Sequence, residues 1–157
     1  MFDFMLYSSS LIIPIIILIP NLLWLLFPPI NIPLQEDNEP VILTVFENIG
    51  RFGVTIIPLF YPITMNNISN RFYIIAMLLL LTVYYAGWFR FFQKGRNHML
   101  LFLPLWHIPI PMAITPILYF FLAAGLLKSS PMFIAAFTLA IGHLPISYKE
   151  YLRISPK

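Results

Sequence analysis

Residues 41–62 read VILTVFENIGRFGVTIIPLFYP, and this stretch decides the fold of the chain. It is long and apolar enough to cross a bilayer, since about 20 such residues span the hydrocarbon core. Glu47 and Arg51 interrupt it at positions i and i+4, which lie on one face of a helix. Ionisable residues at membrane depth are costly and often mark functional sites. The stretch therefore predicts a membrane span with a buried polar site.

Composition extends this interpretation to the whole chain. Of its 157 residues, 60% are hydrophobic and 10% are charged, with a mean hydropathy of +0.86. A soluble domain carries about 25% charged residues. The sequence has no Cys, which excludes disulfides and thiolate metal sites. The basic residues are scattered at loop ends rather than gathered in a patch, so we expect no nucleic-acid partner.

Five apolar segments predict an all-α integral membrane protein, a bundle of about five transmembrane helices in a single domain over residues 1–157. The expected spans cover residues 8–27, 41–62, 71–91, 111–127 and 131–146. Residues 99–110 are too few to cross and contain Pro104 and Pro109. We expect them to form a re-entrant or interfacial piece, with a non-helical break within Trp106–Met112. Glycines and alanines in the second and fifth spans predict close helix packing.

The distribution of Lys and Arg predicts the orientation of the spans. The loops after spans 1 and 3 and the C-terminal tail share one side, and six basic residues fall there: Arg90, Lys94, Arg96, Lys149, Arg153 and Lys157. The other side holds Arg71 and Lys128. Because basic loops stay in the cytoplasm, we expect a multi-pass protein of the cell membrane with its N-terminus outside and its C-terminus cytoplasmic.

Alternating spans also predict which polar residues lie at the same depth. Span 2 begins on the side where spans 1, 3 and 5 end, so Glu47 lies about 9 Å below that side at a rise of 1.5 Å per residue. Arg51 lies about 6 Å deeper. Residues expected in the layer of Glu47 are Asn21, Tyr84, Tyr85, His107 and His143. Together these side chains are candidates for ligand binding or a proton relay, and no catalytic residue is assigned.

Each candidate also has a purely structural interpretation. Glu47 and Arg51 could neutralise each other without a substrate, as polar groups often do between helices. Asn21 could satisfy a carbonyl that the preceding proline leaves free, and His107 could do the same in the proline-rich break. His143 could be an ordinary histidine near a helix end. The histidines and Glu47 lack the HxxxH or ExxH spacing of metal sites, so we expect neither a metal nor a cofactor.

The sequence favours a small polytopic membrane protein whose buried polar cavity binds or translocates a small solute, an ion or a proton. Broken helices and ionisable groups in mid-membrane are features of transporters. One alternative is a membrane-embedded enzyme that acts on a lipid or isoprenoid by Glu/His acid–base chemistry. Another is a non-catalytic accessory or immunity-type protein. The expected partners are the lipid bilayer, a small-molecule or lipid ligand, and further copies of the chain or a larger membrane complex.

Overall fold

The computed structural model describes residues 10–32, 40–63, 68–106 and 108–154, and within these ranges it contains helices but no named strand. The helices are α2 (Ile12–Leu26), α3 (Val41–Ile56), α4 (Ile68–Gln93), α5 (Pro111–Leu126) and α6 (Ser130–Ile154). Two short 3-10 helices, η1 (Ile57–Phe60) and η2 (His98–Leu101), follow α3 and α4. The predicted all-α fold class is confirmed.

Three of these helices are long and apolar enough to cross a membrane: α3 continued by η1, α4 and α6. The apolar helices α2 and α5 are shorter, at 15 and 16 residues. α6 continues through Pro145 to Ile154, beyond the end that the sequence predicted at residue 146. A proline removes one helical hydrogen bond but need not end a helix that packing holds in place. Gly142 and Ser147, on either side of Pro145, are both buried.

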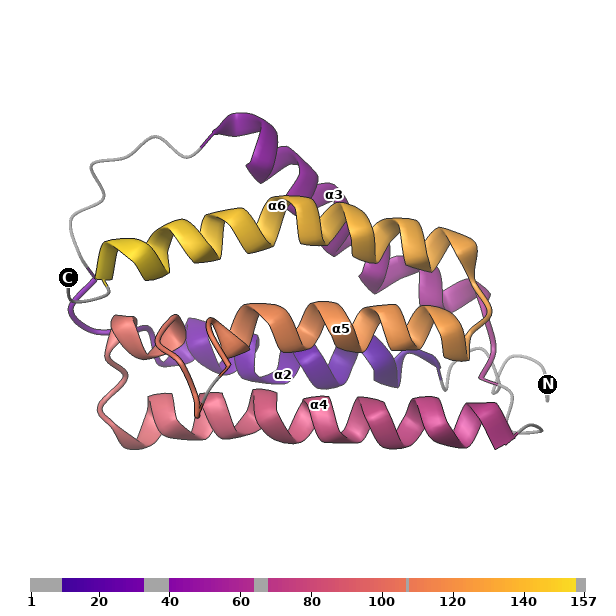
Figure 1. The fold of residues 1–157 in the computed structure, drawn as a ribbon, viewed down its shortest axis with the longest axis horizontal. Coiled ribbons are helices and arrows are strands. Elements are labelled where there is room, and N and C mark those ends of the chain that lie inside the picture. Colours follow the sequence, from indigo (N-terminus) through magenta and orange to yellow (C-terminus); the bar gives the residue numbers. More distant parts are fainter. Residues whose placement is uncertain (1–9, 33–39, 64–67, 107, 155–157) are drawn as a thin grey trace.

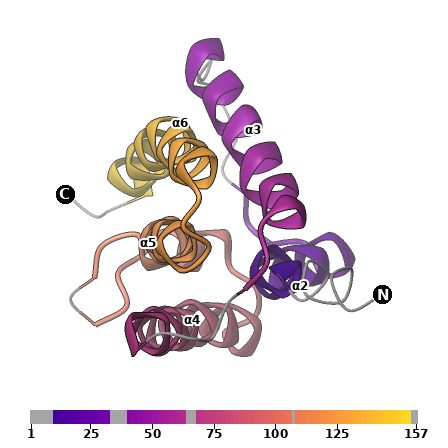
Figure 2. The same cartoon turned by 90° about the vertical axis from the view of Figure 1, so that its right-hand side faces the viewer.

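α5 is the central helix of the fold (Figure 2). α4 and α6 lie on opposite sides of it, and α2 lies next to α4 (Figures 1 and 2). A helix that is apolar on all sides suits such an interior position, and most of α5 is buried, including Ile117, Phe120 and Ala123. α2, α4 and α6 all end on the side of the molecule where the C-terminus lies (Figure 1).

α3 crosses α6 at an angle, and glycines make this crossing close (Figures 1 and 2). A methyl group added at Gly142 would lie 2.7 Å from the Cα atom of Glu47, and one added at Gly50 would lie 2.6 Å from the Cβ atom of Leu139. Both distances are shorter than real Cβ atoms show. Because small residues let two helix backbones meet, the close packing predicted from the sequence is confirmed here.

The described residues of the proline-rich segment between η2 and α5, 102–106 and 108–110, are not helical, as the sequence predicted. Trp106 and Ile110 have positive φ angles of 54° and 38°, and α5 begins at Pro111. Arg90, near the end of α4, holds this segment by donating hydrogen bonds of 2.6–2.9 Å to three carbonyl oxygens, those of Leu100, Leu103 and Pro104. Arg90 thus supplies donors to carbonyl groups that lie outside any helix hydrogen-bond ladder.

Candidate functional site

A cavity of about 570 Å³ lies between the helices and has the size of a small-molecule site. Its walls come from the second half of α2, the last third of α3, the first half of α5 and the later part of α6. η2 and the later part of α4 close one side. Leu22 and Leu25 line it and are 59% and 67% exposed. The cavity therefore opens along α2. Most of its lining is apolar: Ile17, Leu18, Leu22, Trp24, Leu25, Val54, Trp88, Leu101, Phe102, Met112, Ala113, Pro116, Ile117, Phe120 and Leu139.

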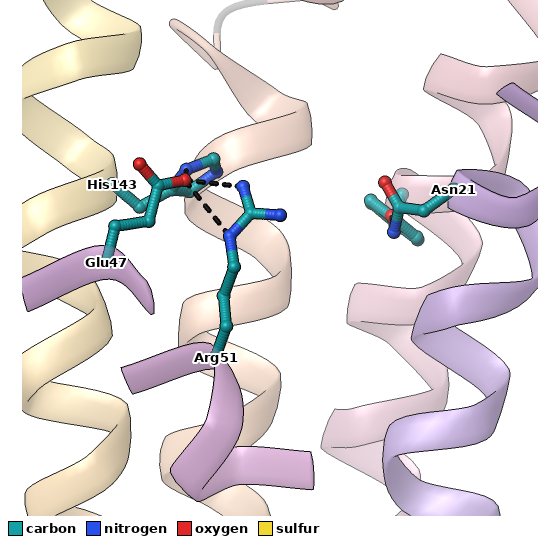
Figure 3. Close-up of polar contacts among 5 residues, drawn as sticks. Asn21, Glu47, Arg51 and His143 are labelled. Atoms are coloured by element: carbon teal, nitrogen blue, oxygen red, sulfur yellow. Dashed lines mark hydrogen bonds and ion pairs between the residues drawn. The ribbon is translucent and has the colours of Figure 1, made fainter. Parts of the chain in front are cut away.

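A polar cluster of Glu47, Arg51 and His143 forms part of one wall (Figure 3). Nδ1 of His143 lies 2.8 Å from Oε1 of Glu47. Nε of Arg51 donates to the same oxygen at 3.1 Å, and its Nη2 also pairs with it. Arg51 and His143 line the cavity, whereas Glu47 lies behind them with its side chain 12% exposed. Two groups that can be cationic thus share one carboxylate.

The helix crossing explains how this cluster forms. Arg51 is one turn after Glu47 on α3, so their side chains meet on one helix face. His143 comes from α6 and directly follows Gly142, where the two backbones meet. Without a side chain at Gly142, α6 lies close enough for the imidazole to reach the carboxylate.

Asn21 lies across the cavity from the cluster (Figure 3). It forms a second polar pair with Tyr84. Nδ2 of Asn21 donates to the hydroxyl of Tyr84 at 3.0 Å and to the carbonyl oxygen of Ile17 at 2.9 Å. The Tyr84 hydroxyl also donates to Ile17 at 3.2 Å. The pair therefore both fastens α2 to α4 and presents polar atoms to the cavity.

Tyr85 is placed differently from Tyr84 and is not among the residues that line the cavity. Its hydroxyl donates to the carbonyl oxygen of Ile16 at 2.6 Å. This is the carbonyl to which Pro20, four residues later, has no N–H to donate. Tyr85 thus completes the hydrogen bonding of α2, and a structural role explains it fully.

Of the residues predicted for one polar layer, the structure brings Glu47 together with His143, and Asn21 together with Tyr84. His143 and Glu47 come together from positions 96 residues apart, and Asn21 meets Tyr84 from 63 residues away. His107, also predicted in the layer, lies outside the described residues. Arg51 was expected to face the bundle interior, but its side chain is 59% exposed because the cavity beside it is open.

Two cavity residues, His98 and Trp88, were not predicted as candidates. Nδ1 of His98 is buried, with no hydrogen-bond partner in the described part of the chain, and lies 3.8 Å from Oε1 of Glu150 on α6. Burial lowers the pKa of His98 below 6.5, while Glu150 opposes this shift. The indole N–H of Trp88 is also buried and lacks a partner among the described residues. In the sequence, Trp88 lies near the end of an apolar segment and His98 in the loop after it, and neither position indicates a cavity.

Groups that can be cationic line the cavity, and the carboxylates lie behind them. Among the described residues that line it, Arg51, His98 and His143 are those that can be cationic, and none is a carboxylate. Glu47 lies behind Arg51 and His143, and Glu150 pairs with His98 from α6. The cavity thus presents hydrogen-bond donors and groups that can be cationic. Such a lining is suited to a ligand that has a large apolar part and a group that accepts hydrogen bonds.

No family model matches this chain, and neither a curated protein nor a solved structure is similar to it. Its function therefore has to be argued from its own residues and their geometry.

Proposed function

We propose that this chain is a multi-pass membrane protein that binds a small, largely apolar molecule in the cavity between its helices. The observation that carries the proposal is the cavity itself, which has apolar walls and two polar groups on opposite sides. An apolar pocket with a few convergent polar groups is the usual form of a ligand site.

In this proposal all five helices cross the bilayer. Large apolar side chains are exposed along four helices, for example Leu22 on α2, Phe52 on α3, Leu79 on α4 and Phe137 on α6. The hydrocarbon of lipids is a suitable surrounding for such surfaces. α2 and α5 are short for a core of about 30 Å, but α5 is enclosed by the other helices and has little lipid to match.

Single-cysteine labelling tests the topology, since the chain has no native Cys. Positions 94 and 128 follow α4 and α5, so Lys94→Cys and Lys128→Cys should react with a membrane-impermeant maleimide from opposite sides of intact cells. The cytoplasmic position should be 94. Reaction of both from the same side would contradict five crossings.

Tryptophan quenching tests ligand binding directly. Trp24 and Trp88 line the cavity, whereas Trp106 is 71% exposed outside it and can be replaced by Phe. The full chain in lipid nanodiscs should show saturable quenching by ω-bromoundecanol, because a bromine atom in the cavity lies against Trp88. Non-saturable quenching, equal to that of a brominated lipid, would contradict the proposal.

A cavity-filling variant supplies the matched control. Ala113 is buried and lines the cavity, so Ala113→Phe should abolish the saturable quenching. The same change at Ala76 on α4, which does not line the cavity, should leave it intact. If the two variants show the same quenching, the bromine atom binds outside the cavity.

A lipid-directed enzyme is a second candidate, and a specific observation favours it. The cavity opens along α2, and the Glu47–His143 pair is a carboxylate and an imidazole within hydrogen-bond distance. Such a pair can serve as an acid–base couple. If this function holds, membrane lipids incubated with the protein should yield a new product by mass spectrometry, and Glu47→Gln should yield none.

A further inference from the structure

We propose that the ligand is an amphiphile with a single carboxylate head, which Arg51 binds, and an apolar tail that lies along α2. This inference rests on the proposed function and names the chemical class of its ligand. Three observations support the inference: the cavity has hydrogen-bond donors without partners among the described residues, its carboxylates lie behind its cationic groups, and the cavity opens along α2.

Arg51 has an unused donor group. Its Nε and Nη2 atoms bind Oε1 of Glu47, and its Nη1 atom has no hydrogen bond to any described residue. Figure 3 shows the guanidinium extending from α3 towards the wall that carries Asn21. The indole N–H of Trp88, 6% exposed and without a partner in the described ranges, is a further donor on the cavity lining. The unpaired indole N–H of Trp88 is buried and therefore costly, and the Nη1 atom of Arg51 faces the open cavity, so an anionic acceptor satisfies both well.

The charges select a singly charged head. Glu47 neutralises Arg51 and shares the same oxygen with His143, so this wall is not anionic, and Arg51 keeps a donor for one further acceptor. A carboxylate brings only a single negative charge to it. A phosphate monoester carries about −1.5 to −2 charges and would leave negative charge uncompensated at membrane depth. A neutral alcohol would satisfy the donors less strongly than an ion.

The opening of the cavity indicates where the tail lies and how the ligand enters. Leu18, Leu22 and Leu25 line the cavity and are 38%, 59% and 67% exposed. In a bilayer this opening faces acyl chains, so a lipid-soluble molecule can enter sideways. The occupant is therefore a single-chain amphiphile drawn from the bilayer rather than a solute from water.

The test compares three brominated probes with the same tail and different heads: ω-bromoundecanoate, ω-bromoundecanol and ω-bromoundecyl phosphate. Each is titrated at about pH 8 against the full chain with Trp106 replaced by Phe, in nanodiscs of unbrominated phosphatidylcholine. Quenching of the cavity tryptophans should give the carboxylate an affinity about tenfold higher than that of the alcohol. The phosphate should bind more weakly than the carboxylate.

Two variants locate the head. Replacing both Glu47 with Gln and Arg51 with Met removes the charges as a pair, and should bring the carboxylate-to-alcohol ratio to about one. Glu47→Gln alone frees two further donors of Arg51, and should raise the ratio about threefold or more. Because this second effect is a gain in binding, unfolding cannot explain it.

The outcomes separate the two proposals. If no probe quenches saturably, the proposed binding function fails and this inference fails with it. If alcohol and carboxylate bind equally to the natural chain, the function stands and the carboxylate head is wrong. Tighter binding of the phosphate, or a ratio that neither variant changes, also overturns the inference.

Discussion

Nδ1 of His143 lies 2.8 Å from Oε1 of Glu47, although 96 residues separate the two in the chain. The contact exists because α3 and α6 meet backbone to backbone at Gly142, one residue before the histidine. The polar wall of the cavity is thus a consequence of helix packing. Changes at the crossing should alter both stability and the site.

Replacing Gly142 with Ala should therefore destabilise the protein by about 1–3 kcal/mol, as overpacking does. The added methyl group would lie 2.7 Å from the Cα atom of Glu47, which is backbone and cannot move aside alone. Gly87→Ala is the control, because the nearest obstacle there is the flexible side chain of Met112 at 2.9 Å. Unfolding in mixed detergent should show a clear loss for the first variant and little for the second. Equal losses would show that the crossing is not close.

A double-mutant cycle should reveal the coupling between Glu47 and Arg51. Glu47→Gln and Arg51→Met each leave polar partners unmatched, so the double variant should lose less stability than the sum of the two. Because Arg51 is 59% exposed, we expect a coupling of only about 0.5–1 kcal/mol. Melting temperatures of the three variants in detergent measure it. Strictly additive losses would mean that the two side chains do not interact.

The hydrogen bond from Tyr85 to Ile16 should stabilise the protein only while Pro20 is present. Tyr85→Phe leaves a carbonyl unpaired, which costs about 1–3 kcal/mol. In a Pro20→Ala background the new N–H can donate to that carbonyl, so the same change should cost less than about 1 kcal/mol. The measurement is the unfolding free energy of the natural chain, the two single variants and the double variant. An equal cost in both backgrounds would remove the explanation given for Tyr85.

His98, which lies outside the apolar helices, should make stability depend on pH. Its pKa in the folded protein is lowered by burial, so the unfolded chain binds more protons between the folded pKa and 6.5. Stability is therefore fully present above pH 6.5 and is lost as the pH falls through the folded pKa. Thermal unfolding from about pH 7.5 to about pH 5 should show this loss, and His98→Asn should reduce it. If the His98→Asn variant loses stability with falling pH as the natural chain does, another titratable group causes the loss.

Much of this fold could be predicted from the sequence, because apolar length and proline placement are strong local signals of where helices lie and end. The non-helical segment before Pro111 and the glycines of α3 were predicted correctly. The i, i+4 spacing also predicted the pairing of Glu47 with Arg51 that the structure shows. These are local features, which the geometry of a single helix determines.

The faces of the helices could not be predicted in the same way. In α4, apolar residues lie on all sides, so their period does not tell which side is buried. Tyr84 and Tyr85 are adjacent and point about 100° apart on the helix, since 3.6 residues make a turn, and only Tyr84 lines the cavity. The place of His98 beside Glu150 depends on how η2 folds back onto α6, which no local pattern indicates.

The bound position of a bromine atom tests the central claim most directly. Crystals of the full chain grown in lipid with ω-bromoundecanol, measured at the bromine absorption edge, would locate the probe without reference to any variant. We predict an anomalous peak inside the cavity between α2 and α5, beside Trp88. A peak found solely on the outer, lipid-facing surface of the helices would contradict the proposal that this protein binds a ligand there.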